Sequence, residues 1–276
     1  MASADPPFGS VAILGLGLIG GSLARDLAAR GVRVLVWDRD PAAVDLAVGQ
    51  RIAEPLSDDA PEIVVLAVPV MAACELLDEL RDELHGARLV TDVGSTKGSI
   101  VALAEKVGIG DRFVGSHPIA GDHRSGWAAS RAGLFAGARV FLSPAPSATE
   151  EAVGLAERLW RMVDARPEML DAEEHDRRLA WSSHLPQLMA SALGGALADA
   201  GVDRAELGPG GRDVTRLAGS SPEMWADIGI DNAGHLAPAL AAAEARLREL
   251  RLALEAGDGA RLRQLLAEAR DWQGSS

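Results

Sequence analysis

The sequence contains little cysteine and no long hydrophobic segment. Cys74 is the only cysteine among 276 residues, which excludes an intrachain disulfide and a metal cage built from several thiolates. No uninterrupted apolar run reaches the roughly 18–20 residues that a membrane-spanning helix requires. The first ten residues lack the basic and apolar segments of a secretory signal. We therefore expect a cytoplasmic protein without a membrane partner.

Basic charge is also in short supply. The 40 acidic residues outnumber the 27 basic ones, which gives a formal net charge of −13, and Lys97 and Lys106 are the only lysines. A surface with this excess of negative charge repels phosphate backbones, so nucleic acid is not expected as a partner. The hydrophobic fraction of 48%, by contrast, is large enough to fill the cores of one large or two medium-sized domains.

The first 170 residues alternate short apolar runs with longer amphipathic segments. Runs that predict strands occupy residues 10–17, 32–38, 62–69, 87–94, 112–117, 138–144 and 166–170. Patterns that predict helices occupy residues 18–31, 72–84, 98–107 and 150–163. Because continuous apolar strands that alternate with helices are typical of a parallel sheet covered on both faces, we predict a Rossmann-type α/β domain over residues 1–170.

Residues 171–276 are helical in pattern almost throughout, and they predict an all-α second domain. Breaks in the helical pattern, rich in glycine or proline, are expected at residues 194–195, 201–213 and 255–260.

The first helix of this second domain carries an unusual polar face. Asp176, Ala180, Ser183 and Gln187 follow one another at spacings of 4, 3 and 4 residues, so they share one side of the helix. The pattern leaves two interpretations open, a solvated face and the wall of a site. Pro186 lies inside the same helix and is expected to kink it.

A glycine-rich loop joins the first predicted strand to the first predicted helix. Gly15, Gly17 and Gly20 form the pattern G-x-G-x-x-G. The first glycine permits a tight turn, the second lets the backbone approach a pyrophosphate, and the third lets the helix pack closely against the sheet. The helix N-terminus adds free N–H groups and partial positive charge. This context favours a dinucleotide site over a turn that serves the fold alone.

An acidic residue at the end of the second predicted strand indicates which dinucleotide binds. Asp38 can accept hydrogen bonds from both ribose hydroxyls, and it would repel a 2′-phosphate by about 4 kcal/mol at 4 Å and an effective dielectric near 20. Because Arg39 can offset part of this repulsion, we expect NAD, with NADP less favoured. The predicted cofactor-binding residues are Gly15, Gly17, Leu18, Ile19, Gly20, Asp38, Arg39, Val68 and Pro69.

Two further polar segments each follow a predicted strand. Residues 91–99 (TDVGSTKGS) contain Ser95, and residues 114–121 (VGSHPIAG) contain His117. Ligands of open α/β sheets bind at the carboxyl ends of strands, where a nicotinamide ring would also lie. A histidine there, with an ordinary pKa of about 6.5, suits removal of a proton from a substrate hydroxyl. A histidine bonded only to neighbouring backbone is the alternative, and the upstream glycine loop favours catalysis.

A segment of the second domain brings arginines to a glycine-rich turn. Residues 208–225 (GPGGRDVTRLAGSSPEMW) include Arg212, Asp213 and Arg216 before a capped helix start. Arginine binds carboxylates through two parallel hydrogen bonds. These arginines are interpreted either as such a grip or as surface ion pairs.

Five motifs, in this order and spacing, resemble those of the prephenate and arogenate dehydrogenases of tyrosine biosynthesis. They are GLGLIGGSLA, DVGSTKG, GSHPIAG, HDRRLAWSSHLP and GGRDVTRLAGSSPEMW, and the resemblance covers residues 10–272. It implies a dinucleotide domain followed by a helical domain through which two subunits form a homodimer. It also implies oxidative decarboxylation of a cyclohexadienol to a phenol, driven by aromatisation without a metal.

The resemblance also assigns roles to individual residues. His117 would draw the proton from the C4 hydroxyl with help from Ser95, while hydride passes from C4 to nicotinamide. Arg216 would bind a substrate carboxylate, and Ser183, Asp213 and Trp225 would shape the pocket.

The sequence departs from the family pattern at two places expected to face the substrate. Asp122-His123 stands where many members have Thr-Glu, and Gln187 stands where prephenate-using members often have histidine. Prephenate is the first expectation for the substrate. Arogenate, whose ammonium group could pair with Asp122, and 4-amino-4-deoxyprephenate are the alternatives.

Two rival functions are weighed. β-Hydroxyacid dehydrogenases share the two-domain plan but usually place a catalytic lysine on a helix of the second domain, and no lysine follows Lys106. A sensor that binds NAD without turnover is the alternative outside enzymes. Many relatives append a regulatory ACT domain. We expect none here, so any feedback control would act at the active site.

Overall fold

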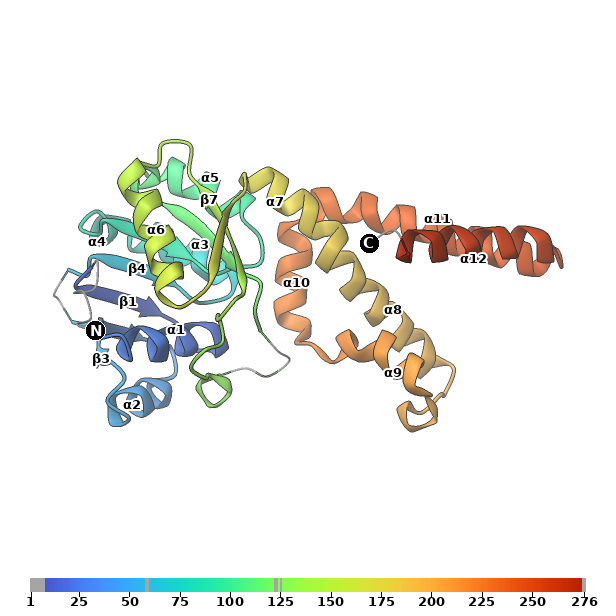
Figure 1. Cartoon of the computed structure of the whole chain (residues 1–276), viewed down its shortest axis with the longest axis horizontal. Coiled ribbons are helices and arrows are strands. Elements are labelled where there is room, and N and C mark those ends of the chain that lie inside the picture. Colours follow the sequence, from blue (N-terminus) through green and yellow to red (C-terminus); the bar gives the residue numbers. More distant parts are fainter. Residues whose placement is uncertain (1–7, 58–59, 122–123, 125, 275–276) are drawn as a thin grey trace.

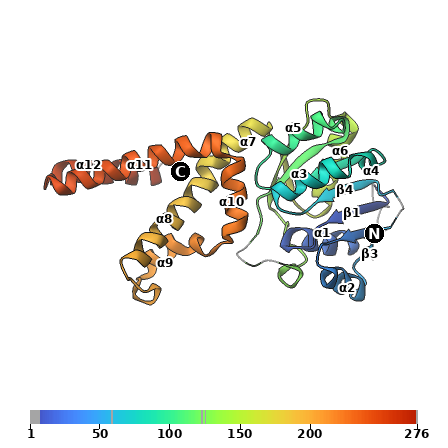
Figure 2. The ribbon, with the colours of Figure 1, turned by 180° about the vertical axis from the view of Figure 1, so that it is seen from behind.

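The structure is a computed structural model that describes residues 8–57, 60–121, 124 and 126–274. An α/β part is followed by a helical part, which extends away from it to one side (Figure 1). Figure 2 shows the same arrangement from behind, with α3 and α5 on the near side of the sheet. This α/β-then-α arrangement is the predicted fold class.

A five-stranded parallel sheet forms the centre of the α/β part, with strand order β3-β2-β1-β4-β5. Its central strands are almost entirely buried because helices cover both of their faces, which explains their continuous apolar runs. The strands are β1 (Ser10–Leu14), β2 (Arg33–Trp37), β3 (Glu54–Pro55), β4 (Ile63–Leu66) and β5 (Leu89–Asp92).

Two hydrophobic cores lie on opposite faces of this sheet. One core joins Ile13 and Val65 to helices α1 and α6, and the other joins Leu14 and Leu66 to α3 and α5. The prediction of a sheet covered on both faces is therefore confirmed for these five strands. The helices of this part are α1 (Leu18–Ala28), α2 (Pro41–Gly49), α3 (Val70–Glu79), α4 (Arg81–Leu84), α5 (Gly98–Lys106) and α6 (Glu150–Met162).

The last three strands form a second, mixed sheet, so the prediction that they continue the parallel series is wrong. In the order β6-β7-β8, β6 pairs antiparallel with β7, and β7 pairs parallel with β8. Parallel pairing needs a crossover, which α6 provides between β7 and β8, whereas the described part of the connection from β6 to β7 holds the short 3-10 turn η2 and no α-helix. The strands are β6 (Val114–Pro118), β7 (Arg139–Pro144) and β8 (Arg166–Met169), and the turns are η1 (Gly110–Arg112) and η2 (Trp127–Ala129).

The helical part begins with a helix that changes its geometry midway. Helix α7 (Ala172–Leu179) passes into a π-helical turn, η3 (Ala180–His184), and then into α8 (Leu185–Asp199). Pro186 lies in the first turn of α8, where its missing N–H is tolerated. The break expected at residues 194–195 is wrong, because α8 continues through both glycines.

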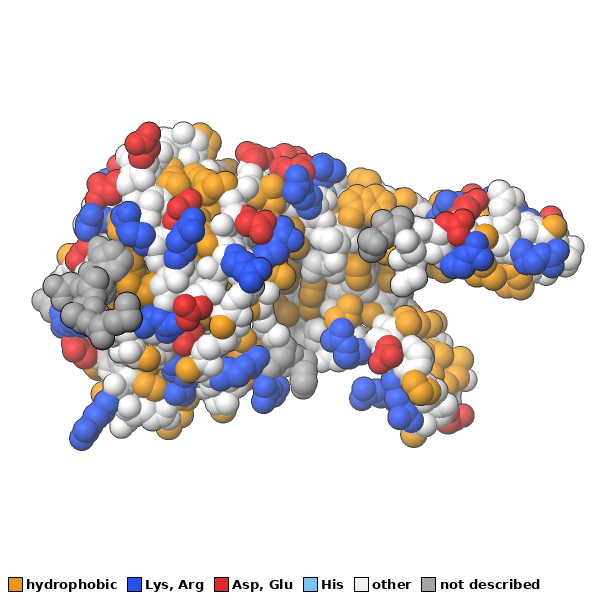
Figure 3. Space-filling model, in the orientation of Figure 1, with side chains coloured by type: hydrophobic (Ala, Val, Ile, Leu, Met, Phe, Trp, Pro, Cys, Tyr) orange, Lys and Arg blue, Asp and Glu red, His pale blue; other side chains and the backbone are white. Residues whose placement is uncertain are grey.

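The remaining helices form two arms. One arm holds α8 and α9, and the other is a hairpin of α11 and α12 joined by ion pairs from Arg246 to Glu268 and from Arg261 to Glu249. The arms stand apart in the space-filling view (Figure 3). The elements are η4 (Arg204–Glu206), α9 (Pro209–Thr215), η5 (Arg216–Gly219), α10 (Pro222–Asp231), α11 (Ala233–Glu255) and α12 (Gly259–Gln273). Within the described residues, no helix combines the length and apolarity needed to span a bilayer.

Candidate active site

The glycine loop has the geometry of a dinucleotide cradle. Gly15 has φ of +107°, and a Cβ there would lie 2.4 Å from the carbonyl oxygen of Ala67, so only glycine fits. A Cβ on Gly20 would lie 2.0 Å from the Gly15 carbonyl oxygen, which explains why α1 can pack so closely against the loop. Gly17 caps α1 and faces open space, so a pyrophosphate could approach the free N–H groups of the helix.

The carboxylate of Asp38 lies at the same edge of the sheet. It accepts hydrogen bonds from the backbone N–H of Leu16 at 2.6 Å and of Asp40 at 2.8 Å. Each oxygen keeps acceptor capacity for a ribose hydroxyl. Arg39 is exposed beside it. Val68, which follows β4, lies against Gly15 on the other side of the loop.

A buried ion pair stabilises the loop between β5 and α5. The Lys97 ammonium pairs with the carboxylate of Asp92, and both side chains are completely buried. Asp92 also accepts hydrogen bonds from the N–H of Gly94 at 2.8 Å and of Ser116 at 3.2 Å. These contacts fix the backbone on both sides of Ser95, whose half-buried side chain makes no hydrogen bond within the described residues.

His117 lies near the end of β6 and lines a cavity of about 840 Å³ between the two parts of the chain. The loop that follows it runs past the glycine cradle, since a Cβ on Gly121 would lie 4.0 Å from Leu18 Cδ2. The cavity is lined by His117, Pro118, Ile119, Ala120, Arg139, Phe141, Arg177, Arg178, Leu179, Trp181, Ser182 and Ser183.

A chain of hydrogen bonds joins His117 to the helical part. Its Nδ1 lies 2.8 Å from Nε2 of His175, and Nδ1 of His175 lies 2.7 Å from Oδ1 of Asp176. The Asp176 carboxylate also accepts hydrogen bonds from the backbone N–H of Lys97 at 2.8 Å and of Gly98 at 2.7 Å. His175 and Asp176 on α7 therefore connect β6 to the start of α5.

Burial and neighbouring charges set the ionisation of this chain. Burial, followed by the nearby His175, Lys97 and His184, lowers the pKa of His117 well below 6.5, so His117 is neutral at pH 7. Burial acts to raise the pKa of Asp176, but the hydrogen bonds from His175 and from the two backbone N–H groups outweigh it and lower the pKa. A neutral imidazole backed by an ionised carboxylate is suited to accept a proton.

A further histidine, His184, is buried beside this chain. Asn232 donates from Nδ2 to the Asp176 carbonyl oxygen at 2.8 Å and faces Nδ1 of His184 at 3.0 Å. Trp225 packs edge-on against the His184 ring, at 5.9 Å between centroids. Burial lowers the pKa of His184 to about 4, so this ring is also neutral at pH 7.

Comparison with family models covers nearly the whole chain. Residues 23–169 match the model described as "Prephenate dehydrogenase, nucleotide-binding domain", and residues 171–268 match "Prephenate dehydrogenase, dimerization domain". The chain belongs to the prephenate dehydrogenase family. The expected family, and with it the oxidoreductase class, is confirmed.

Curated members of the prephenate dehydrogenase family show the same relationship. The chain is 32% identical to a cyclohexadienyl dehydrogenase of Zymomonas mobilis, over 91% of this chain and 90% of that protein. It is 35% identical to a prephenate dehydrogenase of Bacillus subtilis, over 81% of this chain but only 64% of that longer protein. The chain thus spans somewhat less than two thirds of the Bacillus protein.

Solved structures of family members match both parts of the chain. A prephenate dehydrogenase from Aquifex aeolicus in complex with hydroxyphenyl propionate and NAD+ is 31% identical with a TM-score of 0.86, covering 98% of this chain and 99% of that one. A Synechocystis arogenate dehydrogenase is 25% identical with a TM-score of 0.78, covering 96% and 99%.

The structure brings some of the predicted substrate residues of this family member to the cavity and leaves others away from it. Ser183 lines the cavity with His117. Arg216 is exposed on η5 and lines a separate hollow of about 410 Å³ beside α8. Asp213 is exposed on α9, and Asp122 lies outside the described residues. The substrate-binding roles of these residues stay predictions.

Gln187 has another set of contacts. It is buried, donates to the Leu217 carbonyl oxygen at 2.8 Å, and faces Ser220 Oγ at 3.4 Å. The face that it shares with Asp176 and Ala180 is therefore largely internal, which decides against a solvated face.

Sequence reasoning missed His175 as a site residue and gave Asp176 only a place on a polar face. Both occur in the charged run EEHDRR, where a histidine is easily read as exposed. The adjacent pair His-Asp just inside a helix start was the available signal. Its meaning depends on contacts with residues 58 and 78 positions away, which the sequence does not display.

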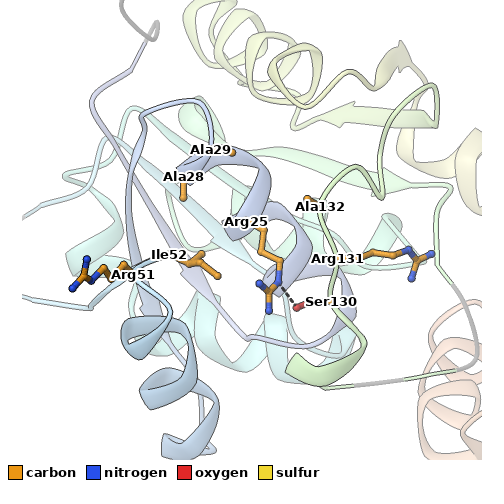
Figure 4. Close-up of a pocket in the computed structure, with 8 residues that line it drawn as sticks. All are labelled: Arg25, Ala28, Ala29, Arg51, Ile52, Ser130, Arg131 and Ala132. Atoms are coloured by element: carbon orange, nitrogen blue, oxygen red, sulfur yellow. Dashed lines mark hydrogen bonds between the residues drawn. The ribbon is translucent and has the colours of Figure 1, made fainter.

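A further hollow lies at the C-terminal end of α1, with a volume of about 430 Å³. Three arginines line it, but Figure 4 shows the Arg51 and Arg131 side chains pointing to opposite sides, while Arg25 turns toward Ser130. Arg25 also stacks over Trp127 at 4.1 Å. The charged groups of Arg51 and Arg131 therefore diverge and do not meet at one point of the hollow.

Proposed function

We propose that this chain is an NAD-dependent prephenate dehydrogenase that converts prephenate to 4-hydroxyphenylpyruvate, CO2 and NADH. The observation that carries the proposal is the position of His117. Its imidazole is neutral, lines a cavity of about 840 Å³, and is followed by a loop that passes the dinucleotide cradle. A base can therefore accept the proton of a hydroxyl group while the carbon that bears this hydroxyl loses hydride to the dinucleotide.

In this mechanism the chain's own residues position the substrate and move one proton. His117 accepts the proton of the C4 hydroxyl while that carbon loses hydride, and Ser95 hydrogen-bonds the same oxygen. NAD, when bound, supplies the acceptor for the hydride. The electron pair of the bond to the leaving carboxylate completes the aromatic ring, and CO2 departs. Loss of CO2 and gain of aromaticity drive the reaction forward without a metal.

NAD is proposed over NADP because of Asp38. Its carboxylate is anchored by the N–H groups of Leu16 and Asp40, so it stays where the adenosine ribose would lie. The ribose hydroxyls donate to it, whereas a 2′-phosphate would be repelled. The proposed cofactor residues are those predicted from the sequence, with Gly15, Gly17 and Gly20 at the pyrophosphate.

Prephenate is favoured over arogenate by the charges around the cavity. Arg139, Arg177 and Arg178 all line it. Within the described residues they pair with two carboxylates, because Glu174 pairs with both Arg177 and Arg178 while Glu168 pairs with Arg139. The surplus of positive charge disfavours the ammonium group of arogenate relative to the keto group of prephenate.

We also propose that the chain acts in the cytoplasm as a homodimer formed through its helical part. The arms expose several large apolar side chains, which a lone chain would leave in water. They are Leu193, Val202, Leu247, Leu252, Leu254, Leu266 and Trp272. Light scattering after size-exclusion chromatography is expected to give twice the monomer mass of 28.8 kDa; a monomer at micromolar concentration would contradict the dimer.

Turnover of three substrates tests the assignment. NADH formation is followed at 340 nm with prephenate, arogenate and 4-amino-4-deoxyprephenate, each with NAD and with NADP. The proposal expects the highest kcat/KM for prephenate with NAD. Higher kcat/KM for either amino-bearing substrate would reassign the enzyme within the family, and NAD binding without turnover of any of them would leave only a sensor.

A further inference from the structure

The hydrogen-bond chain behind His117 begins at a group whose role is unambiguous. Asp176 is ionised, and an ionised carboxylate can only accept hydrogen bonds. Nδ1 of His175, 2.7 Å from Asp176 Oδ1, must therefore be the donor. With its single N–H at Nδ1, the completely buried imidazole of His175 has a lone pair and no proton at Nε2.

The donor of the hydrogen bond between His117 and His175 follows in the same way. Nε2 of His175 faces Nδ1 of His117 at 2.8 Å, so Nδ1 of His117 is the donor of that hydrogen bond. A neutral His117 that is protonated at Nδ1 has its lone pair at Nε2. That nitrogen is not engaged in the chain and remains for a substrate hydroxyl. The order of donors and acceptors thus runs from Asp176 to the basic atom.

We propose that His175, oriented by Asp176, is a positioning residue that fixes the tautomer of His117 so that Nε2 is the base. The proposal deepens the proposed function and rests on it for the identity of the reaction. The tautomer itself, however, follows from hydrogen bonds that exist without substrate. When His117 takes up the proton, the hydrogen bond to His175 also stabilises the imidazolium, as a carboxylate does in the Ser-His-Asp arrangement.

Burial makes this control effective. His175 is 0% exposed and Asp176 is 5% exposed, so water cannot replace either hydrogen bond. The other titratable groups that influence His117 are Lys97, which is paired with Asp92, and His184 in η3. Among the described residues, neither of them hydrogen-bonds the His117 ring, and His175 is its one hydrogen-bond partner.

A purely structural role would predict something different. His175 and Asp176 also connect the helical part to β6 and α5, so their loss could weaken packing alone. Weakened packing would lower stability and affect substrate affinity, but it would not depend on whether residue 175 can accept a hydrogen bond. One experiment therefore measures the tautomer of His117, and another measures the effect of a hydrogen-bond acceptor at position 175.

Nitrogen-15 NMR of histidine-labelled protein at pH 7.5 reads the tautomer directly. The His117 signals are assigned by their loss in His117→Asn. The proposal expects Nδ1 of His117 to be protonated and Nε2 to be bare in the wild type without substrate. A proton on Nε2 of His117 would overturn the proposal. This measurement needs neither turnover nor a folded variant at position 175.

Variants at position 175 then test the acceptor. His175→Phe keeps a ring but removes the acceptor, and kcat is expected to fall about 10²-fold with little change in KM or in NAD affinity. His175→Gln offers an amide oxygen to Nδ1 of His117, and it is expected to retain at least tenfold more kcat than His175→Phe. His235→Phe, which removes a histidine paired with Glu173 elsewhere on the helical part, is the matched control and should leave kcat unchanged.

The outcomes distinguish failure of the positioning role of His175 from failure of the proposed function. Wild-type turnover with equal kcat in the Phe and Gln variants would overturn the positioning role, whichever tautomer is found. A wild type that turns over no cyclohexadienyl substrate would overturn the proposed function, while the tautomer measured by NMR would still support or contradict the hydrogen-bond order.

Discussion

Lys97 and Asp92 form an ion pair with no exposed surface on either side chain. It lies under the loop that carries Ser95, and Asp92 also binds the N–H groups at Gly94 and Ser116. One of the two lysines in the chain thus stabilises the contact between the end of β5 and β6.

Removing one partner of this pair should be costly. Lys97→Met leaves a buried carboxylate without its counter-charge, and we expect the free energy of unfolding to fall by about 3–5 kcal/mol. Urea denaturation at pH 7 measures this. In the double variant Lys97→Met/Asp92→Asn the uncompensated charge is gone, so part of the loss should be recovered. Equal stabilities of Lys97→Met and the wild type would show that the pair carries no such role.

Lys97 illustrates which features of the structure could be predicted from the sequence and which could not. The glycine loop and Asp38 were predictable because they depend on a local strand–turn–helix pattern, and the place of Ser95 after β5 was predictable because parallel strands end at one edge of their sheet. The same rule does not account for His117, because β6 belongs to the second sheet and pairs antiparallel with β7. The second sheet was missed because apolar runs such as residues 112–117 and 138–144 do not display their direction. The roles of His175, Asn232 and the Lys97–Asp92 pair could not be predicted, because they depend on contacts between distant segments. Arg216 was predicted to bind the substrate, whereas in the single chain it lines a different hollow.

The cofactor preference can be altered at Asp38. Asp38→Asn removes the charge that accepts from ribose hydroxyls and repels a 2′-phosphate, so we expect the Kd for NAD to rise about tenfold and the Kd for NADP to fall. Isothermal titration measures both. Asp40→Asn makes the same charge change two residues away, at the cap of α2, and should leave the ratio unchanged. An unaltered NAD-to-NADP ratio in Asp38→Asn would remove Asp38 from the cofactor site.

The pH dependence of catalysis follows from the lowered pKa of His117. A general base acts in its neutral form, and burial, His175, Lys97 and His184 keep the pKa of His117 well below 6.5. We therefore expect kcat/KM for prephenate to be flat from pH 6.5 to 8 and to fall only at lower pH, as His117 is protonated. A loss of activity centred at pH 7 or above would contradict this environment.

His184 makes stability depend on pH in the same direction. Its folded-state pKa of about 4 lies below the unfolded value of 6.5, so the unfolded state binds the extra proton between these two pH values. The contribution is fully present above pH 6.5 and is lost as pH falls toward 4, by about 3 kcal/mol in total. Urea denaturation at pH 7 and pH 4.5 should therefore show a smaller difference for His184→Phe than for the wild type. Identical differences would exclude His184 as the source.

Arg216 tests the predicted grip on the substrate carboxylate. Arg216→Ala is expected to raise KM for prephenate about tenfold or more while changing kcat little, because it removes a binding contact away from the reacting carbon. Arg251→Ala, an arginine paired with Glu255 on α11, is the control. Steady-state kinetics with an unchanged KM in Arg216→Ala would make Arg216 a structural arginine.

NADH formation from prephenate by the wild type and by His117→Asn tests directly whether His117 is the base. We expect turnover by the wild type and a kcat at least 10²-fold lower in the variant, with an unchanged Kd for NAD. Near-normal kcat in His117→Asn would contradict a mechanism in which this imidazole takes the proton beside the departing hydride.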